Sequence, residues 1–237
     1  MRRKAFLANV HQSLRSGSLP QVQSQEPPLS SISSFDPYDL VGQFSQQARE
    51  VKSEVHEVMS HTAGCQRVHD IFSFHQAEKF ISWADEFLPI KGLNHEIVER
   101  GFQLQDSFIP YDPDERRETQ LALSGVTIGI TGAMAGLADT GSVVITCGKG
   151  RGRLASLLPP IHIVLLEARL LSPSMSHFIR LNPEVATQSS NLVFITGPSR
   201  SADIEQTMTL GAHGPKELHV ILITDEMSKE TCVDRSL

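Results

Sequence analysis

Three loops of this 237-residue chain combine glycines with hydroxyl, acidic or basic side chains, directly after strand-like apolar runs. The first is Asp139-Thr140-Gly141-Ser142, the second runs from Gly148 to Arg153, and the third runs from Gly197 to Glu205. In α/β proteins, ligands bind where loops after strands expose backbone N–H groups. We therefore treat these loops as candidate parts of one binding site.

The Asp139-Thr140-Gly141 segment has two interpretations. As a functional loop it offers the Asp139 carboxylate for hydrogen bonding or acid–base chemistry, and the hydroxyls of Thr140 and Ser142 for ligand binding. As a structural loop it is a tight hairpin turn, in which Gly141 supplies a positive φ. Both interpretations predict a turn between two strands.

The second loop, GKGRGR, alternates Gly148, Gly150 and Gly152 with basic residues. The glycines allow backbone amides to approach a ligand closely, and Arg151 and Arg153 suit bidentate hydrogen bonds to a carboxylate or phosphate. The spacing matches neither a P-loop, which needs GxxxxGK before Ser or Thr, nor the dinucleotide pattern GxGxxG. A solvated basic turn is the alternative interpretation.

The third loop, GPSRSADIE, is followed by a second bend, GAHGP. Ser201 suits a helix N-cap, beside which Asp203 and Glu205 would lie and free N–H groups would favour an anion. His213 in the second bend can titrate or donate a hydrogen bond, with an ordinary turn histidine as the alternative. We expect the glycine-containing bends to face one common hollow. The predicted catalytic residues are Asp139, Glu205 and His213; the predicted ligand-binding residues are Thr140, Gly141, Ser142, Gly148, Gly150, Arg151, Gly152, Arg153, Gly197, Pro198, Ser199, Arg200, Ser201, Asp203 and Gly214.

The sequence contains none of the common ligand spacings for a metal ion or an iron–sulfur cluster. The cysteines Cys65, Cys147 and Cys232 form no CxxC pair, whereas structural zinc and iron–sulfur clusters normally need about four closely spaced ligands. The histidines show no HExxH spacing. His162 and His219 open strand-like runs and are interpreted as edge residues with satisfied hydrogen bonds. We therefore predict no metal and no cofactor bound by this chain.

Charge and hydropathy narrow the function classes. The net charge of −6 and pI of about 5.9 predict no general attraction to nucleic acid or anionic membranes. No apolar stretch reaches the ~20 residues of a transmembrane helix. The basic start MRRKAFLANVHQSL is predicted to be an amphipathic helix, with a targeting peptide as the alternative. The scattered cysteines give no disulfide framework, which favours a reducing, cytoplasmic location.

The elements that must position the loops change character along the chain. Residues 1–37 are predicted to form a helix and a Ser/Pro/Gln-rich linker, 38–225 the main domain, and 226–237 a polar tail. Within the main domain, we predict a helical part over 38–124 and an α/β sheet part over 125–225. The helices are expected at 44–64, 75–89, 94–101 and 112–125, with a crossover helix at 172–183. The near-continuous apolar runs after residue 125 are typical of strands covered on both faces.

The segments GITGAMAGLADTGSVVI, GKGRGRLASLLPPIHIVLL and ITGPSRSADIEQTMTLGAHGPKELHVILI together resemble the LUD-domain family, in particular its lactate-utilisation C (LutC/YkgG) branch. The resemblance implies a three-layer α/β/α fold of the NagB/RpiA/CoA-transferase-like type with a helical N-terminal portion. It also implies a subunit or accessory factor in the oxidation of L-lactate to pyruvate, with iron–sulfur clusters carried by partner proteins and an anionic small ligand. Relatives usually have Gly-Pro-Gly at 148–150 and Thr in place of Ser142.

Two other functions stay open on the residues alone. A stand-alone isomerase or acyl-CoA transferase-like enzyme would act on a phosphosugar or thioester, with Glu205 or Asp139 as base or nucleophile. A non-catalytic assembly or regulatory module would use the same loops to shape a protein-binding surface. The first predicts turnover by the chain alone, and the second predicts no small-molecule binding.

Overall fold

The structure is a computed structural model that describes residues 7–9, 11–12, 37–106, 112–202, 208–210 and 214–224. The chain divides into two units, residues 1–34 and residues 35–237. In the first unit, residues 7–9 and 11–12 are helical. The predicted linker up to residue 36 and the predicted polar tail lie outside the described residues. Within the described ranges, no helix combines the length and apolar character needed to cross a membrane.

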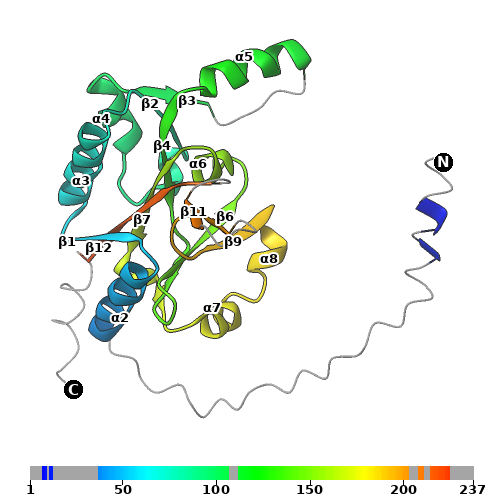
Figure 1. Ribbon diagram of the computed structural model, residues 1–237. Coiled ribbons are helices and arrows are strands. Elements are labelled where there is room, and N and C mark those ends of the chain that lie inside the picture. Colours follow the sequence, from blue (N-terminus) through cyan, green and yellow to red (C-terminus); the bar gives the residue numbers. More distant parts are fainter. Residues whose placement is uncertain are drawn as a thin grey trace. The chain divides into compact units, whose positions relative to one another are not determined.

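The second unit alternates helices and strands along the chain (Figure 1). The helices are α2 (Pro37–Glu50), α3 (His61–Phe74), α4 (Leu93–Glu99), α5 (Pro113–Leu123), α6 (Leu154–Leu157), α7 (Met175–Leu181) and α8 (Val185–Gln188), with 3-10 turns at Asp85–Phe87 and Ala168–Leu170. The strands are β1 (Glu54–Val58), β2 (Lys79–Ser82), β3 (Gln103–Gln105), β4 (Val126–Gly132), β5 (Ala135–Leu137), β6 (Ser142–Cys147), β7 (Ile161–Glu167), β8 (Leu171–Ser172), β9 (Asn191–Ile195), β10 (Arg200–Ala202), β11 (Met208–Leu210) and β12 (Glu217–Ile223).

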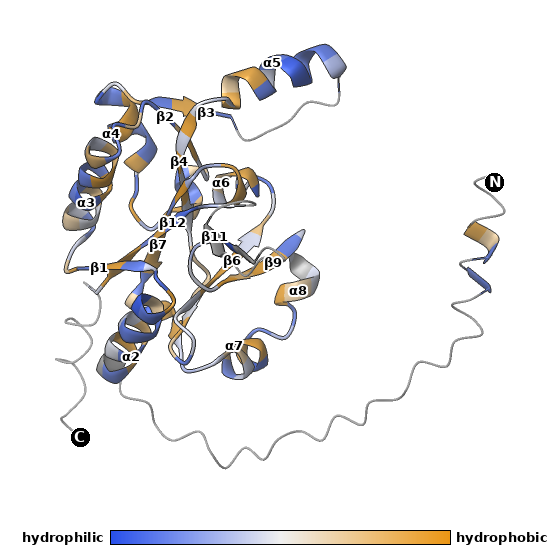
Figure 2. Ribbon diagram, viewed as in Figure 1, coloured by the Kyte–Doolittle hydropathy of each residue, from blue (hydrophilic) through white to orange (hydrophobic). Residues whose placement is uncertain are grey.

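The main sheet has six parallel strands in the order β1-β12-β7-β4-β2-β3. Its strands are apolar on both faces because both faces are covered. Along β12, Val220 and Leu222 join the core cluster of α2, whereas Ile221 and Ile223 join that of α3. Both helices carry a hydrophobic and a hydrophilic side (Figure 2). The predicted α/β fold, with strands covered on both faces, is confirmed.

A second sheet, in the order β8-β5-β6-β9, lies on the α2 side. Its strand β6 contributes Val143 to the core cluster that also holds Phe44 of α2. On its other side, Phe178 of α7 and Val185 of α8 pack against Leu137 and Val144. The strands β10 and β11 form a separate antiparallel pair. The second sheet carries the first predicted loop at one end of β6 and the second loop at the other.

Two predicted helices are wrong. Residues 44–64 do not form one helix, because α2 ends at Glu50, Lys52 has a φ of 70°, and β1 then pairs with β12. The helix predicted over 75–89 is instead β2 followed by a 3-10 turn. In both places, strand pairing in the main sheet outweighs a helical spacing of apolar residues. Residues 38–124 are therefore not a separate helical part, since they supply β1, β2 and β3 to the main sheet.

Other elements match the expectation. The predicted helices at 94–101 and 112–125 correspond to α4 and α5. Asp112 is the N-cap of helix α5, and its carboxylate accepts hydrogen bonds from the backbone N–H groups of Asp114 at 3.0 Å and Glu115 at 3.2 Å. Helix α7 lies where the crossover helix was predicted, but it leads from β8 to β9 in the second sheet, and not between strands of the main sheet.

Candidate functional site

The Asp139-Thr140-Gly141 segment is the turn of the hairpin formed by β5 and β6. Leu137 pairs with Ser142 across this turn, and Gly141 has a φ of 63°. Asp139 is exposed, and its backbone N–H donates to the carbonyl oxygen of Pro173 at 3.1 Å. The prediction of a tight turn with a positive φ at Gly141 is confirmed.

A chain of hydroxyl groups joins this turn to the third loop. The hydroxyl oxygens of Thr140 and Ser142 lie 2.8 Å apart, and those of Ser142 and Thr196 lie 2.7 Å apart. Thr196 directly precedes Gly197, so the two loops lie side by side at this end of β6 and β9. Arg200 donates a hydrogen bond to the carbonyl oxygen of Val51 at 2.8 Å. This bond anchors the third loop to the segment that follows α2.

The second loop lies at the opposite end of β6, roughly 20 Å from Gly141 at the usual rise per strand residue. The backbone oxygen of Gly150 accepts from the N–H of Ala84 at 2.9 Å. The backbone oxygen of Gly152 accepts from the indole N–H of Trp83 at 3.1 Å. These bonds hold the loop against the segment after β2. The expectation that all three loops face one hollow is therefore wrong.

Arg151 has a structural role within the second loop. Its guanidinium donates to the hydroxyl of Thr146 at 2.6 Å and lies 4.9 Å from the centre of the Phe87 ring. Arg153, by contrast, is exposed at the start of α6. Its backbone oxygen accepts from the hydroxyl of Ser156 at 3.1 Å. The two arginines of this loop therefore differ in what they can offer a ligand.

The third loop and the second bend share one cavity of about 140 Å³. The backbone N–H of Ser199 donates to the carbonyl oxygen of Pro215 at 2.8 Å, which joins the two segments. Helix α6 closes another side of the cavity. The described lining consists of Ser156, Leu157, His162, Val193, Ile195, Gly197, Pro198, Ser199, Gly214, Pro215 and Leu218.

The remaining predicted residues of the third loop are placed as follows. Ser201 lies in β10, where it pairs with Thr209, so the predicted helix N-cap at this position is wrong. Asp203, Glu205 and His213 lie outside the described residues. Of the predicted ligand-binding residues, the structure thus brings Gly197, Pro198, Ser199 and Gly214 together around the cavity.

His162 is a cavity residue that the sequence interpretation missed. It is fully buried in β7, and its Nε2 lies 2.9 Å from the hydroxyl of Thr131. Its Nδ1 has no hydrogen-bond partner among the described residues. Burial lowers the pKa of His162 to about 3, so the ring is neutral at physiological pH. The interpretation as a satisfied edge residue is wrong, since β7 is a central strand; the signal was a histidine inside the apolar run PPIHIVLL.

A second cluster of reactive residue types lies between α3 and α4. Cys65 donates to one oxygen of Glu96 at 3.0 Å, and Nε2 of His69 lies 3.3 Å from the other. Arg100 donates to Glu96 at 2.9 Å. Burial, reinforced by the Glu96 carboxylate, raises the pKa of the Cys65 thiol to about 12. Cys65 is therefore a protonated, hydrogen-bonded thiol, which disfavours a nucleophilic role.

We expect Cys65 to resist alkylation in the folded protein at pH 8. A thiol with a pKa near 12 holds roughly a thousandth of the thiolate of a free cysteine. Iodoacetamide labelling followed by peptide mass spectrometry measures this, with the urea-unfolded chain as the positive control. Labelling of Cys65 at equal rates in the folded and unfolded chains would contradict the prediction.

The features described so far define a class of protein: a layered α/β domain in which a parallel sheet and a smaller sheet enclose a small cavity bordered by glycine-containing loops. The LUD domain family matches residues 41–223, and the chain belongs to this family. A relative from Halalkalibacterium halodurans, called "Lactate utilization protein C", is 29% identical over 94% of this chain and 98% of its own length.

Further similarity supports the same family. A protein of the same name from Bacillus subtilis is 37% identical over 48% of this chain and 50% of its own length. The crystal structure of a DUF162 family protein from Deinococcus radiodurans has a TM-score of 0.57, with 16% identity. It covers 80% of this chain and 99% of that protein. This last likeness concerns the fold.

Proposed function

We propose that this chain takes part in lactate utilisation, as a subunit or accessory factor in the oxidation of L-lactate to pyruvate beside iron–sulfur partner proteins. The names of its relatives, one of which aligns with nearly the whole chain, support this role. We propose further that the cavity between the third loop and α6 binds a small carboxylic acid. The size and lining of that cavity are the observation that carries this second step.

The cavity has the size of a small organic molecule. Its volume of about 140 Å³ is close to the ~150 Å³ cavity that accepts benzene in another protein. Lactate and pyruvate have about as many non-hydrogen atoms as benzene. A phosphosugar or an acyl-CoA needs the larger space of an ordinary ligand pocket, roughly 300 Å³ or more. The volume therefore favours a lactate-sized ligand over the substrates of an isomerase or a CoA transferase.

The lining suits a molecule with one apolar and one polar end. Val193, Ile195 and Leu218 offer apolar surface to a methyl group. Ser199 offers a hydroxyl group, and His162 lies in the lining with a buried Nδ1 that has no partner among the described residues. A ligand that bonded to His162 would satisfy a buried polar atom, which is worth about 1 to 3 kcal/mol. Arg153 is outside the cavity lining but lies one helical turn before Ser156 and Leu157, so its charge would attract a carboxylate from a distance.

We expect Arg153→Ala to weaken lactate or pyruvate binding by up to about fivefold, with little change in the free energy of unfolding. The reason is that Arg153 is exposed and outside the cavity lining, so it acts on the carboxylate through its charge alone, and an exposed charge pair is worth about 0.2 to 1 kcal/mol. Arg151→Ala is the matched control in the same loop. It removes the bond to Thr146 and the contact with Phe87, so it should lower stability by about 2 kcal/mol and leave ligand affinity unchanged.

Thermal shift and isothermal titration with L-lactate, pyruvate, ribose 5-phosphate and coenzyme A measure these effects, since a ligand stabilises the state that binds it. Stabilisation by the phosphosugar or coenzyme A alone would contradict the lactate-sized ligand. The role in lactate oxidation is tested separately, by adding the chain to lysate of cells that lack it and following L-lactate-dependent electron transfer. Equal rates with and without the chain would contradict that role.

A further inference from the structure

Two short segments of the main sheet repeat the pattern Glu-x-His. They are Glu54-Val55-His56 in β1 and Glu217-Leu218-His219 in β12. Because side chains alternate along a strand, each glutamate lies on the same face of the sheet as the histidine two residues later. The strands are parallel neighbours, with Glu54 opposite His219. Four potential metal ligands are thus gathered on the face covered by α3.

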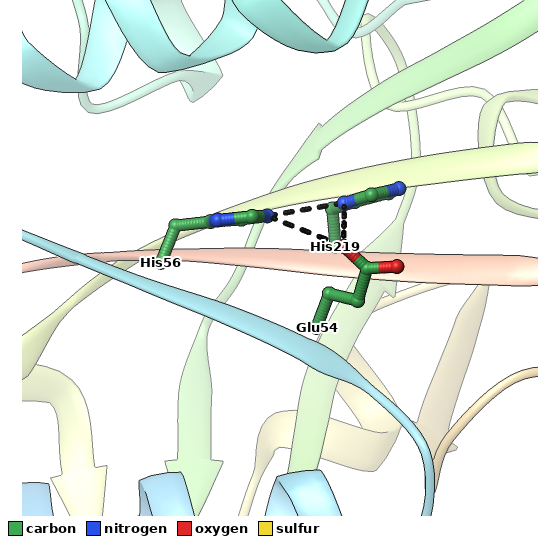
Figure 3. A group of neighbouring side chains, drawn as sticks. All are labelled: Glu54, His56 and His219. Atoms are coloured by element: carbon green, nitrogen blue, oxygen red, sulfur yellow. Dashed lines mark hydrogen bonds and ion pairs between the residues drawn. The ribbon is translucent and has the colours of Figure 1, made fainter. Parts of the chain in front are cut away.

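Three of these side chains converge on one point, as Figure 3 shows. Nε2 of His56 lies 3.1 Å from Nδ1 of His219. Oε2 of Glu54 lies 3.4 Å from Nδ1 of His219 and 4.0 Å from Nε2 of His56. A tetrahedral ion with bonds of about 2.0–2.1 Å requires ligand atoms separated by about 3.3–3.4 Å. Two of the three distances are thus close to those around a bound ion, and the Glu54 carboxylate would move about 0.6 Å toward His56 to complete the set.

We propose that Glu54, His56 and His219 form a binding site for a divalent first-row transition metal such as zinc. Two imidazoles and one carboxylate are a donor set that such ions prefer over magnesium or calcium, which favour oxygen ligands. The site is on the opposite face of β12 from the cavity, since Leu218 lines the cavity and His219 belongs to the cluster. The proposal is therefore independent of the lactate-sized ligand.

The surroundings of His219 favour metal ligation through Nδ1. Its other ring nitrogen, Nε2, lies 3.6 Å from a carboxylate oxygen of Glu217, slightly beyond hydrogen-bond distance. Metal-ligating histidines usually donate their second N–H to a carboxylate, which fixes the tautomer and leaves the first nitrogen free to ligate. Glu217 in turn lies 3.3 Å from Nε2 of His75, at the end of α3. Glu217 is thus placed to orient His219 without binding the ion.

The facing nitrogen atoms of the two histidines lie close enough together to share one ion. Without an ion, the N–H group of one ring must donate a hydrogen bond to the ring nitrogen of the other, 3.1 Å away. An ion between them uses both lone pairs.

Three protein ligands leave a fourth position for water or a small anion. The cluster opens into a cavity of about 320 Å³, whose lining also includes Arg67, Asp70, Phe74 and His75. The side chain of Glu54 is 59% exposed, which gives an ion a route of entry. Sites with three protein ligands and an open position are typical of catalytic metals, whereas structural zinc sites have four protein ligands.

The cluster of Cys65, His69 and Glu96 is the weaker alternative. Its thiol would have to lose a proton whose pKa is near 12, and Glu96 already pairs with Arg100 at 2.9 Å. A dication there would compete with the arginine for the same carboxylate. The Glu54–His56–His219 cluster has no such cation bonded to its ligand atoms among the described residues, because Arg67 pairs with Asp70 and Arg49 with Glu57.

The test uses the full-length protein, freed of metal with a chelator and titrated with Co²⁺ and with Zn²⁺. We expect one equivalent to bind, with visible d–d absorption for Co²⁺ and a higher melting temperature for Zn²⁺. Glu217→Gln should weaken binding by about 10- to 100-fold, the usual effect of changing a partner of a metal-bound histidine. Glu54→Gln and His56→Ala remove ligands and should weaken it more.

The choice of variants separates loss of the metal site from loss of folding. His56→Ala and Glu54→Gln alter partly exposed side chains, so they avoid the risk that His219→Ala, at a buried position, fails to fold. His95→Ala, which removes an exposed histidine paired with Glu99 on α4, is the matched control and should leave affinity unchanged. The proposal is overturned if no equivalent binds, if Glu54→Gln and His56→Ala bind as tightly as the original chain, or if Cys65→Ser alone abolishes binding.

Discussion

Gly141→Ala is expected to lower the free energy of unfolding by about 2 to 5 kcal/mol. Gly141 has a φ of 63°, a conformation that costs an L-residue with a Cβ about 1 to 2 kcal/mol. A Cβ at this position would also overlap the backbone of Ala48, near the end of α2. Relief of that overlap requires α2 to move from a packed core, which typically costs about 1 to 3 kcal/mol more.

Two other glycines separate these causes. Gly129→Ala has no positive φ, but its Cβ would overlap the carbonyl oxygen of Ala155 in α6, so we expect the steric part of the loss alone. Gly42 is exposed in α2, and a Cβ added there would meet no atom within 4 Å, so Gly42→Ala should stabilise the protein by about 0.5 to 1 kcal/mol. Urea unfolding measures all three. If Gly141→Ala lowered the free energy of unfolding by less than about 1 kcal/mol, the turn would relax without strain and the prediction would be wrong.

The parts of the fold that could be predicted from the sequence are those fixed by local chemistry. Asp112 and the proline after it specify the start of α5, and Gly141 specifies the hairpin turn. The apolar runs IHIVLLE and ELHVILI specify buried strands, because no other short element is apolar on every side. In each of these segments the neighbouring residues alone favour one conformation.

The missed elements depend on partners far along the chain. The valines of EVHEV fit a helix as well as a strand by their spacing, and pairing with β12 decides between the two. The same pairing brings His56 to His219, which are 163 residues apart. A search for metal motifs at helical spacing cannot find such a pair. The repeated Glu-x-His pattern is the signal that a search for strand pairs would use.

The candidate cavity was predictable only in part, because it too depends on segments that are far apart in the chain. The third loop and the GAHGP bend were expected to meet, and they do so through Ser199 and Pro215. The second loop has a comparable composition, yet the direction of β6 carries it away from the other two. Residue types identify loops that can hold a ligand, but strand direction decides which of these loops share a site.

His162 is expected to make the protein sensitive to acid. Its pKa falls from 6.5 to about 3 on folding, because the ring is buried. Below pH 6.5 the unfolded chain therefore binds a proton that the folded chain does not, and stability falls as pH falls until it reaches about 3. Above pH 6.5 this contribution is constant. Between pH 7.5 and pH 4.5 the loss amounts to about 2 to 3 kcal/mol from this group, at about 1.36 kcal/mol per pKa unit.

Urea unfolding of the original chain and of His162→Gln at several pH values between 4.5 and 7.5 measures this contribution. The glutamine amide can still bond to Thr131 but does not titrate, so the difference in slope between the two proteins isolates His162. The original chain should lose about 2 to 3 kcal/mol more than the variant over this range. Parallel pH profiles would mean that His162 takes up its proton equally in the folded and unfolded chains, which would contradict a pKa lowered by burial.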